Sequence, residues 1–195
     1  MGLRMKAVTA LTLGAVALGS VPGNAAPAKG WTPDAAQLKK LTPLTPVAGF
    51  KVRPPRGYAP VAVNPGGGTI TAWRGAGRAD GTRPVVMFQK VLIVPKEQSR
   101  YTLAQSFALF MRSGAKGDPS YTQGPTQTGT LAGLPFVRTA WSKTDAQTGR
   151  TERGFNYMGR RGGGEFFLLG SQNKSPDAAA ALALAEASVL TFRPK

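Results

Sequence analysis

The period of the hydrophobic positions changes several times along the chain, and these changes predict the secondary structure. Residues 50–53 alternate apolar and charged side chains, as a half-exposed strand does. A second run rich in β-forming residues covers 69–73. Residues 85–94 are apolar on both alternating faces apart from Gln89 and Lys90. A strand of this kind is covered on two sides, so we expect it in the middle of a sheet.

Two segments have the period of a helix instead. Within 102–115 the apolar side chains form one stripe, and Thr102 with Gln105 fits a capping box. The second helix begins at Ser175-Pro176-Asp177, where a capping side chain is followed by a proline suited to the first turn, and it continues to about Ala187. We expect the aromatic stripe of the first helix to pack on a sheet rather than to bind a cofactor.

Four further strands are predicted, at 126–131, 136–142, 153–160 and 165–170. Their connections are short and rich in turn residues, which favours antiparallel neighbours and a meander of hairpins. Nearby glycines lack the spacing of a dinucleotide-binding loop and are expected in turns with positive φ; they are Gly75, Gly77 and Gly81, and Gly159 with the glycines at 162–164. The order of elements predicts an α+β fold, an antiparallel sheet of about six to seven strands sandwiched by two helices.

The first residues have the pattern of a secretory signal peptide. Arg4 and Lys6 precede an apolar run over 7–21, and small residues follow the Pro22-Gly23 break. The run is short for a bilayer-spanning helix, which needs about twenty residues. We therefore predict a signal peptide at 1–26, with cleavage as late as residue 28 left open, and an exported mature chain. Residues 27–49 are rich in proline and predict an arm or linker outside the core, with Trp31 resting on the domain formed by 50–195.

Composition argues against most enzyme chemistry. The chain has 25 Lys and Arg, 9 Asp and Glu, and neither His nor Cys, for a net charge of +16. His and Cys are the usual general bases, nucleophiles and soft metal ligands near neutral pH. Glu97, Glu152, Glu165 and Glu186 are distant in sequence, and three of them adjoin turns or basic strands, where a solvated ion pair is the common explanation. We predict no catalytic residue, cofactor or metal, while an unusual Lys or Tyr mechanism stays open.

Several residues carry a resemblance to a known family. They are the segment 49–52 followed by 55–58, Trp73, the turn at 131–134, and the helix end at 187–192. Together these resemble the PsbP-like fold shared by the extrinsic lumenal subunit of photosystem II, its Ran-binding relatives and many bacterial exported proteins. The resemblance implies an α+β domain that binds or assembles rather than catalyses. The metal-linked residues of the plant subunit include His, so none is carried over to this chain.

Two functions remain open, beside the simpler interpretation of a merely solvated basic surface. The first is an exported, non-catalytic binding or assembly module that contacts a protein partner in the cell envelope. The second is an electrostatic binder of a polyanion, nucleic acid or an acidic glycan, which requires the arginines to gather on one face. The candidate contact residues for either function are Arg74, Arg78, Arg83, Arg150, Arg153, Arg160 and Arg161.

Overall fold

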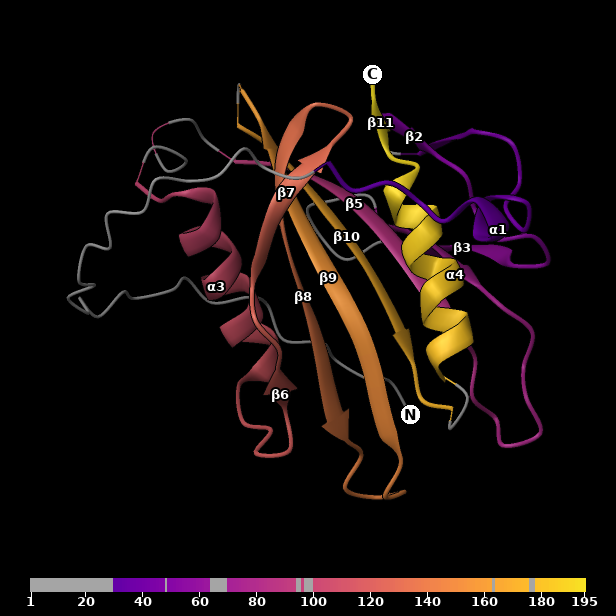
Figure 1. Cartoon of the computed structure of the whole chain (residues 1–195). Coiled ribbons are helices and arrows are strands. Elements are labelled where there is room, and N and C mark those ends of the chain that lie inside the picture. The colour runs from indigo at the N-terminus through magenta and orange to yellow at the C-terminus, as the bar shows by residue number, and fades with distance from the viewer. Residues whose placement is uncertain are drawn as a thin grey trace.

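A large antiparallel sheet forms the centre of the protein, as a computed structural model shows (Figure 1). The structure describes residues 30–47, 49–63, 70–93, 96, 100–162, 164–175 and 178–195. The sheet has eight strands in the order β3-β4-β5-β10-β9-β8-β6, with β7 beside β8. The strands are β3 (Ala59–Val63), β4 (Ile70–Arg74), β5 (Val85–Leu92), β6 (Thr122–Gln123), β7 (Gln127–Leu131), β8 (Leu134–Thr144), β9 (Thr151–Arg161) and β10 (Glu165–Asn173).

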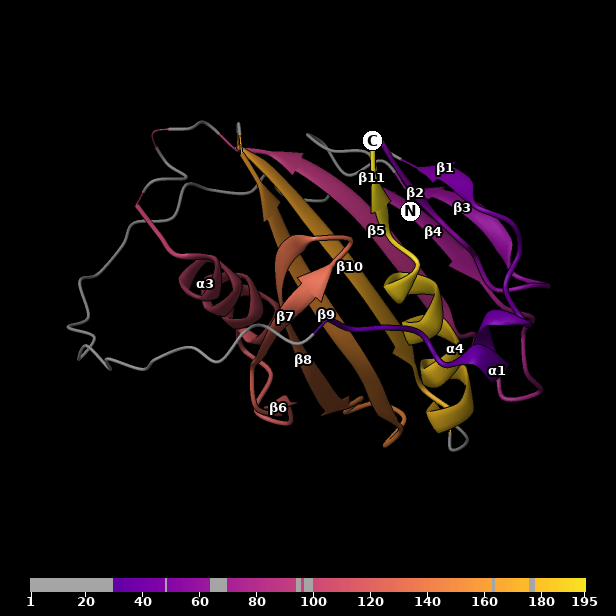
Figure 2. The same cartoon turned by 45° about the horizontal axis from the view of Figure 1, so that its top comes forward.

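Two long helices cover opposite faces of this sheet (Figures 1 and 2). Helix α3 (Leu103–Ala115) contributes Phe107 and Met111 to a smaller apolar cluster, and α4 (Ala178–Leu190) contributes Ala185 and Val189 to the main core. Alternate strand residues are divided between the two clusters, as the pleat of a sheet requires. The predicted capping box is present at α3, where Thr102 and Gln105 bond each other's backbone N–H groups.

A small second sheet closes the main core beside α4. It contains β1 (Thr45–Val47), β2 (Phe50–Val52) and β11 (Arg193–Pro194), with β2 in the middle. The Phe192 ring lies against the rings of Phe50, Phe136 and Phe167, with centroids 4.9 to 5.4 Å apart. The C-terminal residues therefore complete the core, although they come last in the chain.

The predicted fold class is confirmed, and the strand at 85–94 does lie inside the sheet, between β4 and β10. The large sheet contains β3 and the two-residue β6, which were not anticipated, whereas the strand predicted at 50–53 is β2 of the small sheet. The predicted signal peptide, and the Pro176-Asp177 start of the second helix, lie outside the described residues.

The proline-rich segment is more closely integrated than an arm outside the core. Its Leu41 and Val47 are buried, so that prediction was wrong, because β1 pairs with β2 and brings Val47 inside. The short helix α1 (Ala35–Leu38) is capped by Asp34, whose side chain accepts hydrogen bonds from the backbone N–H groups of Ala36 and Gln37. Trp31 rests on the domain as expected, with its ring edge-on to Tyr157 at 5.4 Å.

Candidate functional site

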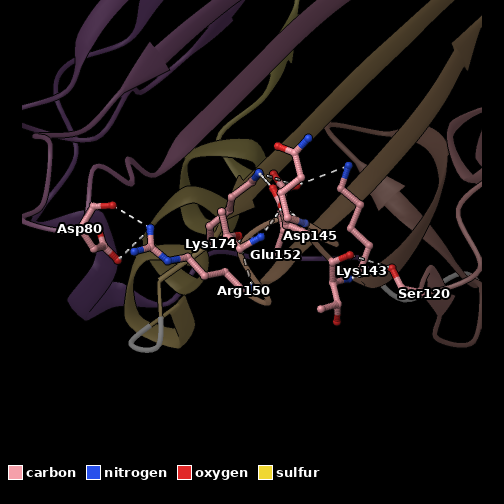
Figure 3. A network of polar contacts seen from close by, with 10 residues as sticks. Asp80, Ser120, Lys143, Asp145, Arg150, Glu152 and Lys174 are labelled. Carbon is pink, nitrogen blue, oxygen red and sulfur yellow. Dashed lines mark hydrogen bonds and ion pairs between the residues drawn. The ribbon is translucent and has the colours of Figure 1, made fainter.

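A charged cleft lies at one end of the large sheet, where β10 ends and β5 and β9 begin (Figure 3). It encloses about 350 Å³ between the β4–β5 loop, the β8–β9 hairpin and the last residues of β10. Three carboxylates and several cations line it. The residues that make up this charged cleft are Asp80, Thr82, Arg83, Asp145, Thr148, Arg150, Glu152, Gln172, Asn173 and Lys174.

Asp145 organises the hairpin that forms one wall. Its Oδ1 accepts hydrogen bonds from the backbone N–H groups of Gln147 and Thr148, both at 3.0 Å, which is the usual role of Asp in a tight turn. Its backbone N–H donates to the carbonyl of Arg150, closing the loop at 2.9 Å. Gly149 supplies the positive φ of 65° that the turn needs. Asp145 is thereby fixed with its Oδ2 directed to Lys174.

Lys174 joins two of the carboxylates. Its Nζ lies 3.1 Å from Asp145 Oδ2 and 3.9 Å from Glu152 Oε2, and Lys143 Nζ lies 3.4 Å from the same Glu152 oxygen. The Glu152 side chain is only 6% exposed, whereas Lys143 and Lys174 are each 39% exposed. The ion pair expected at Glu152 is present, but its carboxylate is buried; β8 and β9 place Lys143 directly opposite it.

Asp80 holds the other side of the cleft. Its Oδ1 accepts hydrogen bonds from the backbone N–H and the hydroxyl of Thr82, at 2.9 and 2.7 Å, and these bonds lower the pKa of its carboxyl. Arg150 reaches across from the hairpin, and its Nη1 donates to the backbone carbonyl of Asp80 at 2.7 Å. The two loops are thus tied together by a side chain that remains exposed.

Asn173 presents an unused donor at this cleft. Its Oδ1 accepts hydrogen bonds from Arg78 Nη1 at 2.9 Å and from the backbone N–H of Ser175 at 3.3 Å, which fixes the orientation of the amide. The residue is 1% exposed, and its Nδ2 is buried without a hydrogen-bond partner. An unpaired buried N–H group costs about 1–3 kcal/mol. This Nδ2 is out of contact with solvent, so an acceptor in the cleft would reach it only if neighbouring side chains moved.

The ionised carboxylate of Asp145 leads to a pH-dependence prediction. The hydrogen bond from Lys174, and next those from Thr148 and Gln147, lower its pKa from 3.8 to about 2. On acidification the unfolded chain binds this proton first, so the stabilisation is complete above pH 3.8 and is lost as the pH falls to about 2. We expect stability in urea to fall more steeply over this range in the wild type than in Asp145→Asn. An Asp145 ¹³C carboxyl titration centred near 3.8 would contradict this assignment.

The structure brings five of the seven predicted arginines to the cleft end of the sheet. Two of the five lie in strands, Arg74 opposite Val85 and Arg153 opposite Asn173. The residues of β10 and β9 aligned with Arg74 are each one position away from Asn173 and Arg153, so the Arg74 and Arg153 side chains point to opposite faces of the sheet. Arg74, Arg83 and Arg153 are exposed, so the five surround the end of the sheet instead of forming one flat patch.

Arg160 and Arg161 lie at the other end of β9, seven to eight residues from Arg153, or roughly 25 Å. Both side chains form hydrogen bonds or ion pairs with other groups of the chain. Arg160 donates to the carbonyl of Tyr101 at 3.2 Å, and Arg161 pairs with Glu165 and with the carbonyl of Lys195. The structure does not bring these two to the charged cleft.

The residues that sequence reasoning missed are the acidic and amide groups of the cleft. Asp145, Glu152 and Lys174 are spread over thirty positions, and only the register of β8, β9 and β10 brings them together. The one local signal was the turn-rich connection between the strands predicted at 136–142 and 153–160, which correctly indicated a hairpin but not that Lys174 lies beside it.

The fold is PsbP-like, as the sequence resemblance implied. The solution structure of cyanobacterial PsbP from Synechocystis sp. PCC 6803 matches with a TM-score of 0.53 at 14% identity, over 91% of this chain and 99% of that one. A crystal structure of LpqN, involved in cell envelope biogenesis of Mycobacterium tuberculosis, matches with a TM-score of 0.44 at 15% identity, over 70% and 91%. No known family and no curated protein matches the sequence.

Two features, a metal-binding cluster and a membrane-spanning helix, are absent from the described residues. In that part of the chain, His, Cys, Asp and Glu form no group of three or more that could hold a metal ion. None of the helices there has both the length and the apolar character needed to cross a bilayer.

Proposed function

We propose that this chain is an exported, non-catalytic binding module whose charged cleft receives a carboxylate of a partner protein in the cell envelope. The observation that carries the proposal is the buried Asn173 Nδ2 donor, which has no acceptor and belongs to a cleft lined by Arg83, Arg150 and Lys174. A carboxylate of an acidic side chain, or of a chain terminus, is an acceptor that matches this donor set. Export is supported by the signal-peptide pattern of the first 26 residues.

The acidic groups of the cleft support binding over catalysis. Hydrogen bonds lower the pKa of both Asp80 and Asp145, which keeps them ionised near neutral pH and makes them poor general acids. Their effect is instead to fix Arg150 and Lys174 in place before a partner arrives. Cations held in this way lose less conformational entropy when they bind an anion.

The same carboxylates count against a polyanion as the partner. An extended nucleic acid or acidic glycan would meet Asp80 and Asp145 beside the arginines, and Arg74 and Arg153 lie on opposite faces. A concave site of about 350 Å³ suits one carboxylate and its neighbours better than a run of phosphates.

Site-specific photo-crosslinking in the source cells tests the proposal. A photoreactive amino acid at position 83 or 153 is expected to capture one discrete envelope protein, and the same residue at position 162, at the other end of β9, is not. Arg150→Ala with Lys174→Ala should reduce the capture at position 83 about tenfold or more, because both held cations are gone. Equal capture from position 162, or capture of nucleic acid or glycan only, would contradict the proposal.

A further inference from the structure

A second cavity lies away from the charged cleft, between the start of the proline-rich segment, β8 and α4. It encloses about 430 Å³. Trp31, Asp34 and Gln37 line it from one side, and Arg138 and Glu186 line it from the other. Three segments far apart in the sequence therefore bring one aromatic ring and four polar side chains to one place.

A hydrogen-bonded pair beneath the cavity holds these groups in position. The hydroxyl of Tyr157 donates to Glu186 Oε1 at 2.6 Å, and Arg138 Nη1 lies 2.9 Å from the same oxygen. The Arg138 guanidinium also lies over the Trp31 and Tyr157 rings, at 5.9 and 5.4 Å. Burial raises the pKa of Tyr157, and the charge of Glu186 raises it further, so the phenol stays protonated and remains a donor.

The polar atoms left without partners in this cavity are mostly acceptors. Gln37 Oε1 is buried and has no hydrogen-bond partner. Asp34 uses only Oδ1 to cap α1, and Glu186 uses only Oε1, so the second oxygen of each carboxylate has no hydrogen bond or ion pair with another described residue. Arg138 uses only Nη1 in its hydrogen bonds and ion pairs, so its other guanidinium nitrogens can still donate. The cavity thus offers several acceptors, one remaining donor group and an indole.

We propose that this cavity binds a neutral, polyhydroxylated ligand of the saccharide class. Sugar hydroxyls donate to the free carboxylate oxygens, and to Gln37 once its amide turns toward the cavity, while accepting from Arg138. The apolar face of a sugar ring packs on the indole of Trp31. An organic cation would also satisfy the acceptors and would meet two carboxylates against one arginine, but it could not accept from the Arg138 donors, and it would approach a chain of net charge +16. This inference does not depend on the function proposed for the charged cleft.

The proline-rich segment becomes part of the site under this proposal. The backbone N–H of Trp31 donates to the carbonyl of Thr130 at 3.1 Å, which fixes the segment against β7. In Figure 2 this segment runs from β7 to α1 across the front of the domain. Its docking supplies Trp31, Asp34 and Gln37, so ligand binding and docking should reinforce each other.

NMR of the indole N–H groups in the mature chain tests the proposal, because Trp31, Trp73 and Trp141 give three separate signals. Maltose, cellobiose and N-acetylglucosamine are added in turn, to about 10 mM. With at least one of them the Trp31 signal should shift and saturate, while those of buried Trp73 and of Trp141, on the α3 face, stay in place. Gln37→Met should weaken the affinity about fivefold, because a sugar hydroxyl loses its acceptor.

Two controls keep the result interpretable. Trp141→Phe, on the other face of the sheet, should leave the sugar affinity unchanged. If Gln37→Met moves the Trp31 signal before sugar is added, Glu186→Gln replaces it, since the amide keeps an acceptor for Tyr157 but loses the free oxygen. No Trp31 shift with any of the three sugars, an unchanged affinity in the acceptor variant, or a stronger response to spermidine at equal concentration would overturn the proposal.

Discussion

Replacing Phe192 by alanine is expected to lower the free energy of unfolding by about 3–5 kcal/mol. The side chain is fully buried, and its ring contacts those of Phe50, Phe136 and Phe167. These three come from the small sheet, β8 and β10, so the cavity left by the change would loosen the junction between the two sheets. Domains of this kind have a total stability of about 5–15 kcal/mol, so the variant should be close to unfolding at ambient temperature.

Urea denaturation of the mature chain, followed by circular dichroism, measures this effect. Leu92→Ala is the matched control, since Leu92 is 72% exposed and should change the free energy of unfolding by less than about 0.5 kcal/mol. A Phe192→Ala loss as small as that of the control would mean that the C-terminal residues do not complete the core.

The second large effect is expected from Gly159→Ala, which should destabilise the chain by about 3 kcal/mol. A methyl group at this position would lie 2.2 to 2.4 Å from three carbons of the Phe136 ring. That ring belongs to the buried core and packs on Phe192, so it cannot move aside without disturbing its neighbours.

Gly162→Ala provides the same chemical change in an open environment, where an added Cβ meets no atom within 4 Å. It should leave the melting temperature within a few degrees of the wild type, whereas Gly159→Ala should lower it by more than about ten degrees. Similar melting temperatures for the two variants would show that Phe136 is not held against the β9 backbone.

Gly159 also shows where sequence reasoning fails. It stands near the glycines at 162–164, and we predicted a turn with positive φ; in fact it lies within β9, where its missing side chain makes room for Phe136. The prediction is confirmed for Gly81 and Gly164, which do have positive φ, but not for Gly75 and Gly77. Local sequence does not separate these cases, because the atom that excludes a side chain comes from another strand.

The elements predicted correctly are those with a strong local signal. The continuous apolar run of β5 and the capped amphipathic α3 follow from period and capping alone. In the small sheet only the central strand β2 has such a signal, the alternation that predicted a strand at 50–53. The outer strands β1 and β11 contain Pro46 and Pro194, which sequence rules exclude from central strands, and both lie at edges of β2.

The candidate sites also combine features that the sequence predicts locally with features that depend on strand pairing. Arginine positions and the hairpin turn could be predicted, but the pairing of Glu152 with Lys143, and of Asp145 with Lys174, depends on strand register. Sequence favoured a uniformly basic surface, whereas the structure groups three of the few carboxylates among the cations of one cleft.

The most direct test of the binding account is the side-chain amide signal of Asn173 in ¹⁵N-labelled mature protein. The probe is a short acetylated peptide with a free, acidic C-terminus, and the control is the same peptide with its carboxylates amidated. We predict a saturable downfield shift of the Asn173 Nδ2 protons with the acidic peptide only, and its loss when Arg150→Ala is combined with Lys174→Ala. An amide signal that stays in place, or moves equally with both peptides, would contradict it.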